Sequence, residues 1–355
     1  MSSTAVPVLP GAWKLSGAVV AWPHGWQRPA RTEEWSFEQY ASCGAHPHFA
    51  QVVAFPWATL VDLLDRGHLV RARPFLDALA LAPPLATLVR ATVCQHVRVE
   101  RVLPMLKSLR VTDLFWSHAR NDQPVLDGIR VHPFPLYPVR ALDRASPIAF
   151  EATPIGERRL LYSFVGAYAR EGYLSPVREW IFDLPQRPDA HVVRRDQWHY
   201  ETMVYGEQIA LRETPPDQRA RLAREGDAFD AVLLDSIFSL CPSGSGPNSI
   251  RLWESLGFGC IPVLLADTLR LPGSAEEWDA AIVRVPETRD AVAALPARLQ
   301  EIAGDPERLR RMQTAGRRLW VRYGERGPST VLGVLDDRGW IRERCRSADT
   351  AFAAA

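Results

Sequence analysis

The sequence is poor in lysine, in cysteine and in long apolar runs, and each shortage excludes a class of protein. No apolar run reaches the roughly 18 residues of a membrane-spanning helix. The five cysteines form no Cys-x-x-Cys pair and no disulfide framework, so we expect free thiols in a reducing compartment. Nearly all of the 42 basic residues are arginine, and 41 acidic residues balance them. The resulting net charge of +1 gives no support for a nucleic-acid partner.

Motifs of metal-dependent transferases, dehydrogenases and secreted proteins are also missing. No Asp-x-Asp occurs anywhere in the chain, so we expect neither a metal site nor a cofactor. No Gly-x-Gly-x-x-Gly joins an early strand to a helix, which argues against an NAD-dependent dehydrogenase. The amino-terminal residues do not have the pattern of a secretory leader. We therefore expect a cytoplasmic location, with at most peripheral contact at the inner face of the cytoplasmic membrane.

The most informative stretch covers residues 233–267. Within it, the apolar residues 237–241 favour a buried parallel strand, and the small and proline residues 242–247 favour a loop. Asn248 or Ser249 is expected to cap the helix that follows, and a second apolar strand completes the stretch. The pattern predicts one β-loop-α-β unit with its loop at the carboxyl end of a strand. Ligands of open α/β sheets bind at such ends.

The loop and the helix together predict an anion-binding site. A glycine- and serine-rich loop before a helix N-terminus offers backbone N–H groups and the positive end of the helix dipole, which suit phosphate. The dipole contributes only about 0.3–1 kcal/mol at an exposed site, so we expect cationic side chains to assist. Glu254 lies in this otherwise apolar helix and allows two interpretations. It could pair with Arg251 one turn earlier, or it could accept hydrogen bonds from ribose hydroxyls.

Residues 238–267, FSLCPSGSGPNSIRLWESLGFGCIPVLLAD, resemble the sugar-nucleotide-binding core of exostosin-like glycosyltransferases. Residues 159–168, RLLYSFVGAY, resemble the opening strand of the same domain. The resemblance implies a bacterial-type, single-module member with the α/β GT-B fold, in which two Rossmann-like domains face each other across a cleft. It also implies inverting, metal-independent transfer from a nucleoside diphosphate sugar, with a UDP-sugar favoured. The implied acceptor is a carbohydrate or lipid-linked glycan in surface polysaccharide or lipopolysaccharide biosynthesis.

Strands and helices alternate along the rest of the chain, as in proteins with parallel sheets. We expect an N-terminal Rossmann-like acceptor-binding domain over residues 1–150 and a C-terminal Rossmann-like nucleotide-sugar-binding domain over residues 151–330. A C-terminal helix and a frayed tail are expected over residues 331–355. The proline-rich residues 133–154 are the expected linker, and a late strand is expected over residues 280–285.

Three residues are candidates for the catalytic base. His118 and His24 each follow a predicted strand, and imidazole titrates near neutral pH. Asp122 lies four residues after His118. A structural role stays open for each histidine. The predicted donor-binding residues are Gly166, Arg170, Ser243, Gly244, Ser245, Gly246, Asn248, Ser249, Arg251 and Glu254. Of these, Arg170 could equally be an ordinary surface arginine.

Two other classes of function fit the same pattern, because a fold does not specify a function. One is a nucleotide-sugar epimerase or hydrolase, which needs no acceptor. The other is a non-catalytic pseudoenzyme that binds glycan. Incubation of a donor with and without acceptors separates the first alternative from a transferase, and titration with UDP and GDP separates the second.

Overall fold

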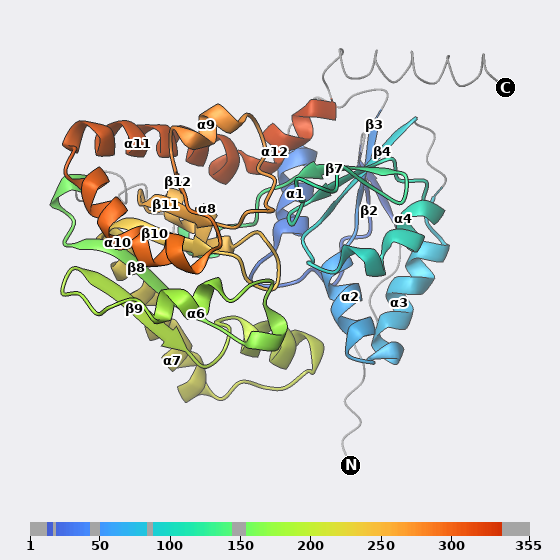
Figure 1. Cartoon of the computed structure of the whole chain (residues 1–355). Coiled ribbons are helices and arrows are strands. Elements are labelled where there is room, and N and C mark those ends of the chain that lie inside the picture. Colours follow the sequence, from blue (N-terminus) through green and yellow to red (C-terminus); the bar gives the residue numbers. More distant parts are fainter. Residues whose placement is uncertain (1–12, 17–18, 43–49, 84–87, 144–153, 336–355) are drawn as a thin grey trace.

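The computed structural model describes residues 13–16, 19–42, 50–83, 88–143 and 154–335 (Figure 1). Two α/β domains lie side by side, and each has its own sheet. Residues 144–153 of the expected linker and residues 336–355 of the expected C-terminal helix and tail lie outside the described residues, as do Cys43 and Cys345. The other three cysteines are buried free thiols. Among the described residues, no helix has the length and apolar character needed to cross a membrane.

The first domain is built on a seven-stranded sheet in the order β1-β2-β3-β4-β5-β7-β6. The five inner strands pair in parallel and follow chain order, and an antiparallel strand closes each edge. Consecutive residues such as Val52 and Val53 are both buried, which is typical of parallel strands covered on two faces. The strands are β1 (Lys14–Ser16), β2 (Val19–Ala21), β3 (Ala50–Ala54), β4 (Val89–Cys94), β5 (Asp113–Trp116), β6 (Val125–Leu126) and β7 (Ile129–Pro133).

Helices cover both faces of this sheet. On one face, Tyr40 of α1 (Thr32–Ser42) packs in a core with Val19 and Val52. On the other face, Phe75 packs in a second core with Trp22 and with residues of three helices. These helices are α2 (Trp57–Asp65), α3 (Leu69–Ala80) and α4 (Leu103–Ser108), and the domain also contains η1 (Val99–Arg101) and α5 (Val139–Leu142).

The second domain is built on a five-stranded parallel sheet in the order β12-β11-β10-β8-β9. From β8 the chain passes to β9 on one side, and it later returns to form β10 on the other side. This change of direction makes a topological switch point, and a crevice forms there at the carboxyl ends of β8 and β10. The expected GT-B architecture of two α/β domains is confirmed. The strands are β8 (Leu160–Ala167), β9 (Ala190–Arg195), β10 (Ser236–Pro242), β11 (Ile261–Leu265) and β12 (Val283–Arg284).

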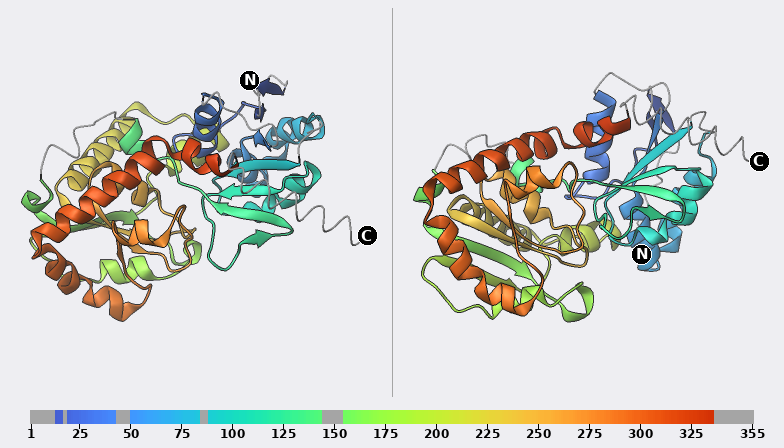
Figure 2. Two further views of the ribbon diagram at one scale, coloured as in Figure 1. Left: turned by 90° about the horizontal axis from the view of Figure 1, so that it is seen from above. Right: turned by 45° about the horizontal axis from the view of Figure 1, so that its top comes forward.

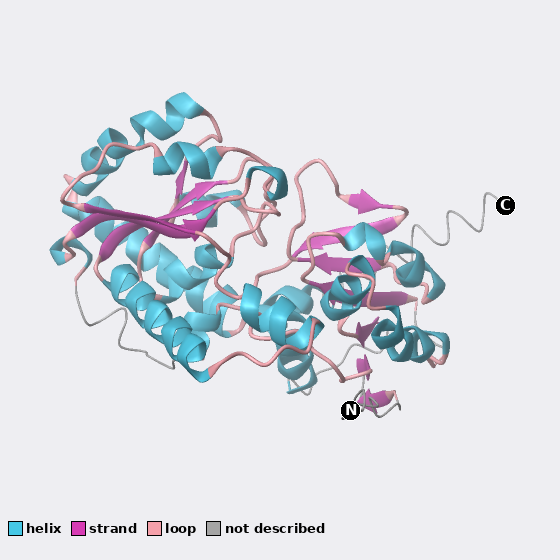
Figure 3. Ribbon diagram, turned by 90° about the horizontal axis from the view of Figure 1, so that it is seen from below, coloured by secondary structure: helices cyan, strands magenta, loops and turns pink. Residues whose placement is uncertain are grey.

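Helices flank both faces of the second sheet (Figure 3). They are α6 (Val177–Phe182), α7 (Pro216–Leu234), α8 (Ile250–Gly257), α9 (Ala275–Asp279), α10 (Arg289–Ala303) and α11 (Pro306–Leu319), with the short turns η3 (Ile155–Glu157) and η4 (Arg170–Gly172). The strand expected over residues 280–285 is longer than the strand in the structure, β12, which covers only Val283–Arg284. Ala281 and Ile282 donate to the carbonyl of Trp278 in helix-like turns, so strand pairing begins only at Val283.

Two segments of the second half pack on the first domain. The π-helix η5 (Thr202–Ile209) places Ile209 in the core that contains Phe75, and Arg71 Nη2 donates to the carbonyl of Gln208 (2.8 Å). Helix α11 continues through the π-helix η6 (Trp320–Glu325) into α12 (Gly327–Leu332), which lies against α1 (Figure 2), and η7 (Gly333–Leu335) follows. A Cβ at position 327 would overlap the ring of Trp35. By these contacts, residues 327–332 belong with the first domain.

Arg158 ties the first strand of the second sheet to the ends of two helices. Its side chain is buried, and Nη1 donates to the carbonyls of Leu233 (3.3 Å) and Ser236 (2.9 Å). Nη2 donates to the carbonyl of Phe258 (3.0 Å). Leu233 and Phe258 stand at the C-terminal ends of α7 and α8, where helix carbonyls carry partial negative charge. The carbonyls at the C-terminal ends of the two helices thus stabilise the buried guanidinium, a role that a carboxylate often has in other proteins.

The Arg158→Met substitution should lower the free energy of unfolding by about 2–4 kcal/mol, because buried carbonyls lose a charged donor. Urea denaturation of both proteins measures the change. The matched control is Arg159→Met, since Arg159 is exposed and pairs with Asp235 at the surface. An equal loss of stability in the two variants would contradict this role for Arg158.

Candidate functional site

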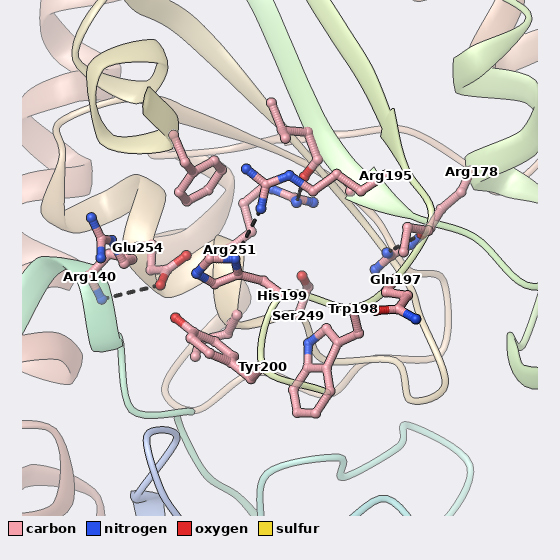
Figure 4. A pocket seen from close by; sticks show the side chains of 15 residues that line it. Arg140, Arg178, Arg195, Gln197, Trp198, His199, Tyr200, Ser249, Arg251 and Glu254 are labelled. Atoms are coloured by element: carbon pink, nitrogen blue, oxygen red, sulfur yellow. Dashed lines mark hydrogen bonds between the residues drawn. The ribbon is translucent and has the colours of Figure 1, made fainter. Parts of the chain in front are cut away.

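A cavity of about 100 Å³ lies at the switch point between β8 and β10, and we call it the switch-point cavity (Figure 4). A larger chamber of about 700 Å³ between β9 and α7 shares six lining residues with it. Ligand sites of proteins have volumes of about 300–1,000 Å³, so the two together have room for a nucleotide. The switch-point cavity is lined by Arg140, Val165, Gly166, Ala167, Arg178, Arg195, Gln197, Trp198, His199, Tyr200, Phe229, Ser249, Ile250, Arg251 and Glu254.

Arg251, in the first turn of α8, is a buried cation with unused donors. Its Nη2 donates to the carbonyl of Val165, whereas Nε and Nη1 have no hydrogen-bond partner among the residues that the structure describes. No more than 9% of the residue is exposed, and burial lowers the pKa of its guanidinium. Since a buried donor without a partner costs about 1–3 kcal/mol, and more when it is charged, this arrangement favours an anion in the cavity.

Arg178 adds a second buried guanidinium to the same cavity. Its Nε donates to the carbonyl of Ser243 (2.8 Å) and its Nη1 to the carbonyl of Ala167 (2.9 Å). Burial, and then the charge of Arg251, lowers the pKa of Arg178 to about 10. The side chain therefore stays cationic at neutral pH. Two adjacent guanidinium groups are well suited to the several oxygens of a diphosphate.

Two further arginines line the cavity and are bound to protein groups. Arg195 Nη1 lies 3.1 Å from His199 Nδ1, and Nη2 donates to the carbonyl of Glu225 (3.2 Å). Burial, and then the charge of Arg195, lowers the pKa of His199 to about 4. Arg140 forms two hydrogen bonds with Asp230 (2.8 and 2.7 Å). Because an acidic partner already neutralises Arg140, Arg178 and Arg251 are the better candidates for ligand contact.

Glu254 is the carboxyl group that lines the switch-point cavity. It stands one turn after Arg251 on α8 and is only 2% exposed. The backbone N–H of Arg140 donates to its Oε1 (3.3 Å; Figure 4). Burial raises the pKa of Glu254 to about 7. The i,i+3 pair with Arg251, one of the two interpretations of Glu254, does not form between these two described side chains. The carboxyl group therefore keeps capacity to accept hydrogen bonds from a ligand.

The pKa of Glu254 predicts a pH-dependent stability of the ligand-free protein. Between pH of about 4.5 and 7 the folded state binds a proton that the unfolded chain has lost, so stability should fall as the pH rises through this window. Relative to Glu254→Gln, the wild type should lose at most about 3 kcal/mol over the window. Urea denaturation at several pH values measures this difference. Parallel pH profiles for the two proteins would contradict the raised pKa.

Four of the ten predicted donor-binding residues line the switch-point cavity: Gly166, Ser249, Arg251 and Glu254. Six do not: Arg170, Ser243, Gly244, Ser245, Gly246 and Asn248. The side chain of Arg170 is 80% exposed and lies 3.1 Å from Glu179. Its contacts are those of a surface ion pair.

The small-residue loop before α8 packs against the first domain. A Cβ at position 246 would overlap the ring of His118. Asn248 Nδ2 donates to the carbonyl of Ser117 (2.6 Å), and its Oδ1 accepts from Trp253 Nε1 (2.9 Å). The expected side-chain cap is wrong: Ser249 holds the N-cap position of α8 without a capping hydrogen bond. Gly246 and Asn248 thus contact the first domain, whereas a Cβ at position 244 would lie against Arg178 and Tyr173 of the second domain.

None of the three predicted bases lines the switch-point cavity. His118 is buried, and burial lowers its pKa to about 3. His24 is partly buried beside Trp22 with its ring edge-on, and burial lowers its pKa too. The side chain of Asp122 is 64% exposed and lies 3.4 Å from Arg120. Among the described residues, no group of three or more potential metal ligands occurs.

Sequence reasoning missed several residues of the cavity, namely Arg140, Arg178, Arg195, Trp198, His199 and Tyr200. One of them had a usable signal. Arg178 is a charged residue at the start of a predicted helix that carries several apolar residues, the same signal that singled out Glu254. Of the others, Arg140 lies in the short helix α5, Arg195 is the last residue of β9, and Trp198, His199 and Tyr200 follow β9. None of them stands in a sequence pattern of its own. Only the fold brings them to the switch point.

Curated relatives match parts of the chain. A 138-residue stretch, 39% of this chain, is 30% identical to the Exostosin-1 homolog of Caenorhabditis elegans and covers 34% of it. A stretch of 57 residues, 16% of this chain, is 46% identical to the probable glucuronoxylan glucuronosyltransferase IRX7 of Arabidopsis thaliana and covers 13% of it. The chain thus spans about a third or less of these relatives. The family model of the exostosin GT47 domain matches residues 127–301.

Residues 127–301 of this chain are thus an exostosin GT47 domain. All residues that line the switch-point cavity of this exostosin-like protein fall within the matched residues 127–301. Among solved structures, WaaG, a glycosyltransferase involved in lipopolysaccharide biosynthesis, is 12% identical with a TM-score of 0.44 and covers 89% of this chain and 99% of that chain. A glycosyltransferase from Rickettsia africae is 12% identical with a TM-score of 0.41, over 89% of this chain and 96% of that one.

Proposed function

We propose that this exostosin-like protein is an inverting glycosyltransferase. It would transfer a sugar from a nucleoside diphosphate sugar to a carbohydrate or lipid-linked glycan acceptor. The observation that carries the proposal is the buried Arg251, which lines the cavity together with Arg178 and whose Nε and Nη1 have no hydrogen-bond partner among the described residues. The expected setting is surface polysaccharide or lipopolysaccharide synthesis, on the cytoplasmic side of the membrane.

In this proposal the diphosphate lies against Arg251, Arg178 and the first backbone N–H groups of α8. Negative charge grows on the leaving diphosphate as the glycosidic bond to phosphate breaks. Guanidinium groups that the fold already holds in place stabilise this charge without reorganisation. They supply the positive charge that the leaving group requires, so the proposed reaction needs no metal ion.

Glu254 would accept hydrogen bonds from the ribose hydroxyls. The larger chamber beside Trp198 would then take the nucleobase, since it opens from the same group of residues. A UDP-sugar remains the favoured donor. Relatives are named for glucuronosyl and xylosyl transfer, so donors carrying these two sugars belong in the first screen.

Inversion requires the acceptor hydroxyl to attack the face of the sugar opposite the diphosphate, while a base takes its proton. Of the three predicted bases, Asp122 and His24 are partly or largely exposed, whereas His118 is buried under the loop at Gly246. Residues beside Asp122 contact the second domain, where Asn121 N donates to the carbonyl of Thr268 (3.0 Å). We infer that Asp122 and His24 are the better candidates for the base.

Product analysis distinguishes the proposed transferase from its alternatives. The protein is incubated with UDP-glucuronate, UDP-xylose or other nucleotide sugars, with and without oligosaccharide acceptors. A transferase forms a new glycosidic bond only when the acceptor is present, and NMR coupling constants then give the anomeric configuration of the product. Donor conversion without an acceptor would indicate an epimerase or hydrolase. Binding of neither UDP nor GDP would indicate the pseudoenzyme.

The Arg251→Met substitution should weaken UDP or GDP binding at least tenfold, which is about 1.4 kcal/mol, because the diphosphate loses its most deeply buried cation. Calorimetric titration measures the dissociation constant, and thermal shift reports the same loss. The control is Arg170→Met, which removes an exposed arginine outside the cavity. Unchanged nucleotide affinity in Arg251→Met, or equal losses in both variants, would refute the proposed site.

A further inference from the structure

Glu287 connects four loops at the carboxyl edge of the second sheet. Its Oε1 accepts hydrogen bonds from the hydroxyls of Ser175 (2.7 Å) and Ser243. Its Oε2 accepts from the backbone N–H of Asp267 (3.0 Å), and the Glu287 N–H donates in return to Asp267 Oδ2 (3.0 Å). These four residues follow β8, β10, β11 and β12. One carboxylate therefore fixes every loop that leaves the inner strands towards the crevice.

Ser243 passes this constraint on to the switch-point cavity. Its N–H donates to the carbonyl of Leu265 (2.8 Å), and its own carbonyl accepts from Arg178 Nε (2.8 Å). The hydroxyl of Ser243 already donates to Glu287, so it is not free to donate to a ligand. What Ser243 contributes to the cavity is the position of its carbonyl, and that carbonyl orients Arg178.

The hydrogen bonds that Glu287 accepts from the two serine hydroxyls are charge-assisted. Hydrogen bonds from a hydroxyl to a carboxylate are shorter and roughly twice as strong as those between neutral groups. Arg178 has a second fixed partner in the carbonyl of Ala167 (2.9 Å), and its guanidinium stands 4.7 Å above the ring of Tyr173. The orientation of the Arg178 side chain therefore depends on the loops after β8 and β10. Glu287 is hydrogen-bonded to both loops, through Ser175 and Ser243.

We propose that Glu287 is a positioning residue for nucleotide binding, which holds Arg178 in place through the hydroxyl and carbonyl of Ser243. This inference rests on the proposed function, because it takes Arg178 as a ligand of the diphosphate. It goes beyond the cavity itself, since Glu287 is not among the residues that line it. A misplacement of about 1 Å at such a contact can cost a hundredfold in rate.

A double-mutant cycle tests the inference. Calorimetry with UDP and GDP is carried out on the wild type, Glu287→Ala, Arg178→Ala and the double variant. Glu287→Ala should raise the dissociation constant about tenfold, and Arg178→Ala should raise it more. The double variant should match Arg178→Ala within twofold, because Glu287 has nothing left to position. A purely structural role would not produce this loss of additivity.

Three further measurements make the outcome decisive. Ser243→Ala breaks the same connection without removing a charge and should reproduce the tenfold loss, even where Glu287→Ala fails to fold. Glu287→Gln keeps one acceptor oxygen and should restore part of the affinity. The control, Glu307→Ala, removes an exposed carboxylate that pairs with Arg311 and should leave the affinity unchanged.

Wild-type affinity in both Ser243→Ala and Glu287→Ala, or multiplied losses in the double variant, would overturn the positioning role. A wild type that binds neither nucleotide would instead overturn the proposed function, and this inference with it.

Discussion

The guanidinium of Arg251 is a buried cation whose only hydrogen bond within the described part of the chain goes to a backbone carbonyl. Removing an ion from water costs several kcal/mol, which a protein normally recovers with an acidic partner. Here the acid on the same helix, Glu254, has a raised pKa. It accepts a hydrogen bond from the backbone N–H of Arg140 and does not pair with Arg251. In the ligand-free site the desolvation cost of the Arg251 guanidinium is not compensated by an acidic partner. An anion that binds there would compensate it. Charge that is held ready in this way is also what a departing diphosphate requires.

The sheet topology explains why this cation stands where it does. Strands β8 and β10 are neighbours, but the chain leaves them in opposite directions, so no connecting loop covers the crevice between their carboxyl ends. Helix α8 begins beside this crevice and turns Arg251 and Glu254 towards it. Arg178 approaches from the helix after β8, and Arg195 from the end of β9. The site therefore combines residues from three elements, α6, β9 and α8, and a parallel sheet with a switch point brings them together.

The sequence allowed the β-loop-α-β unit and its two charged residues to be found, because a charged residue in an apolar helix is visible without any tertiary information. Gly166 could be found for a similar reason, as the end of a recognisable strand. The sequence did not predict the contacts that the loop makes with the first domain: Gly246 makes room for His118, and Asn248 donates to the carbonyl of Ser117. A small residue allows close approach, but the sequence does not show whether a ligand or another domain approaches. Residues such as Arg195 and Tyr200 depend wholly on the fold.

The wall of the cavity is not a property of the second domain alone. Trp198, His199 and Tyr200 line the cavity, and the π-helix that begins two residues later is bonded to the first domain through Arg71. Tyr200 and Val204 pack in one core with Trp35 and Tyr137 of the first domain, and α12 packs against α1, the helix that carries Trp35. A change in the relative position of the domains would therefore displace residues 198–200, which form one side of the cavity. The first domain thus supports one wall of the cavity by holding that segment in place, and under the proposed function domain geometry and nucleotide affinity should be coupled through it.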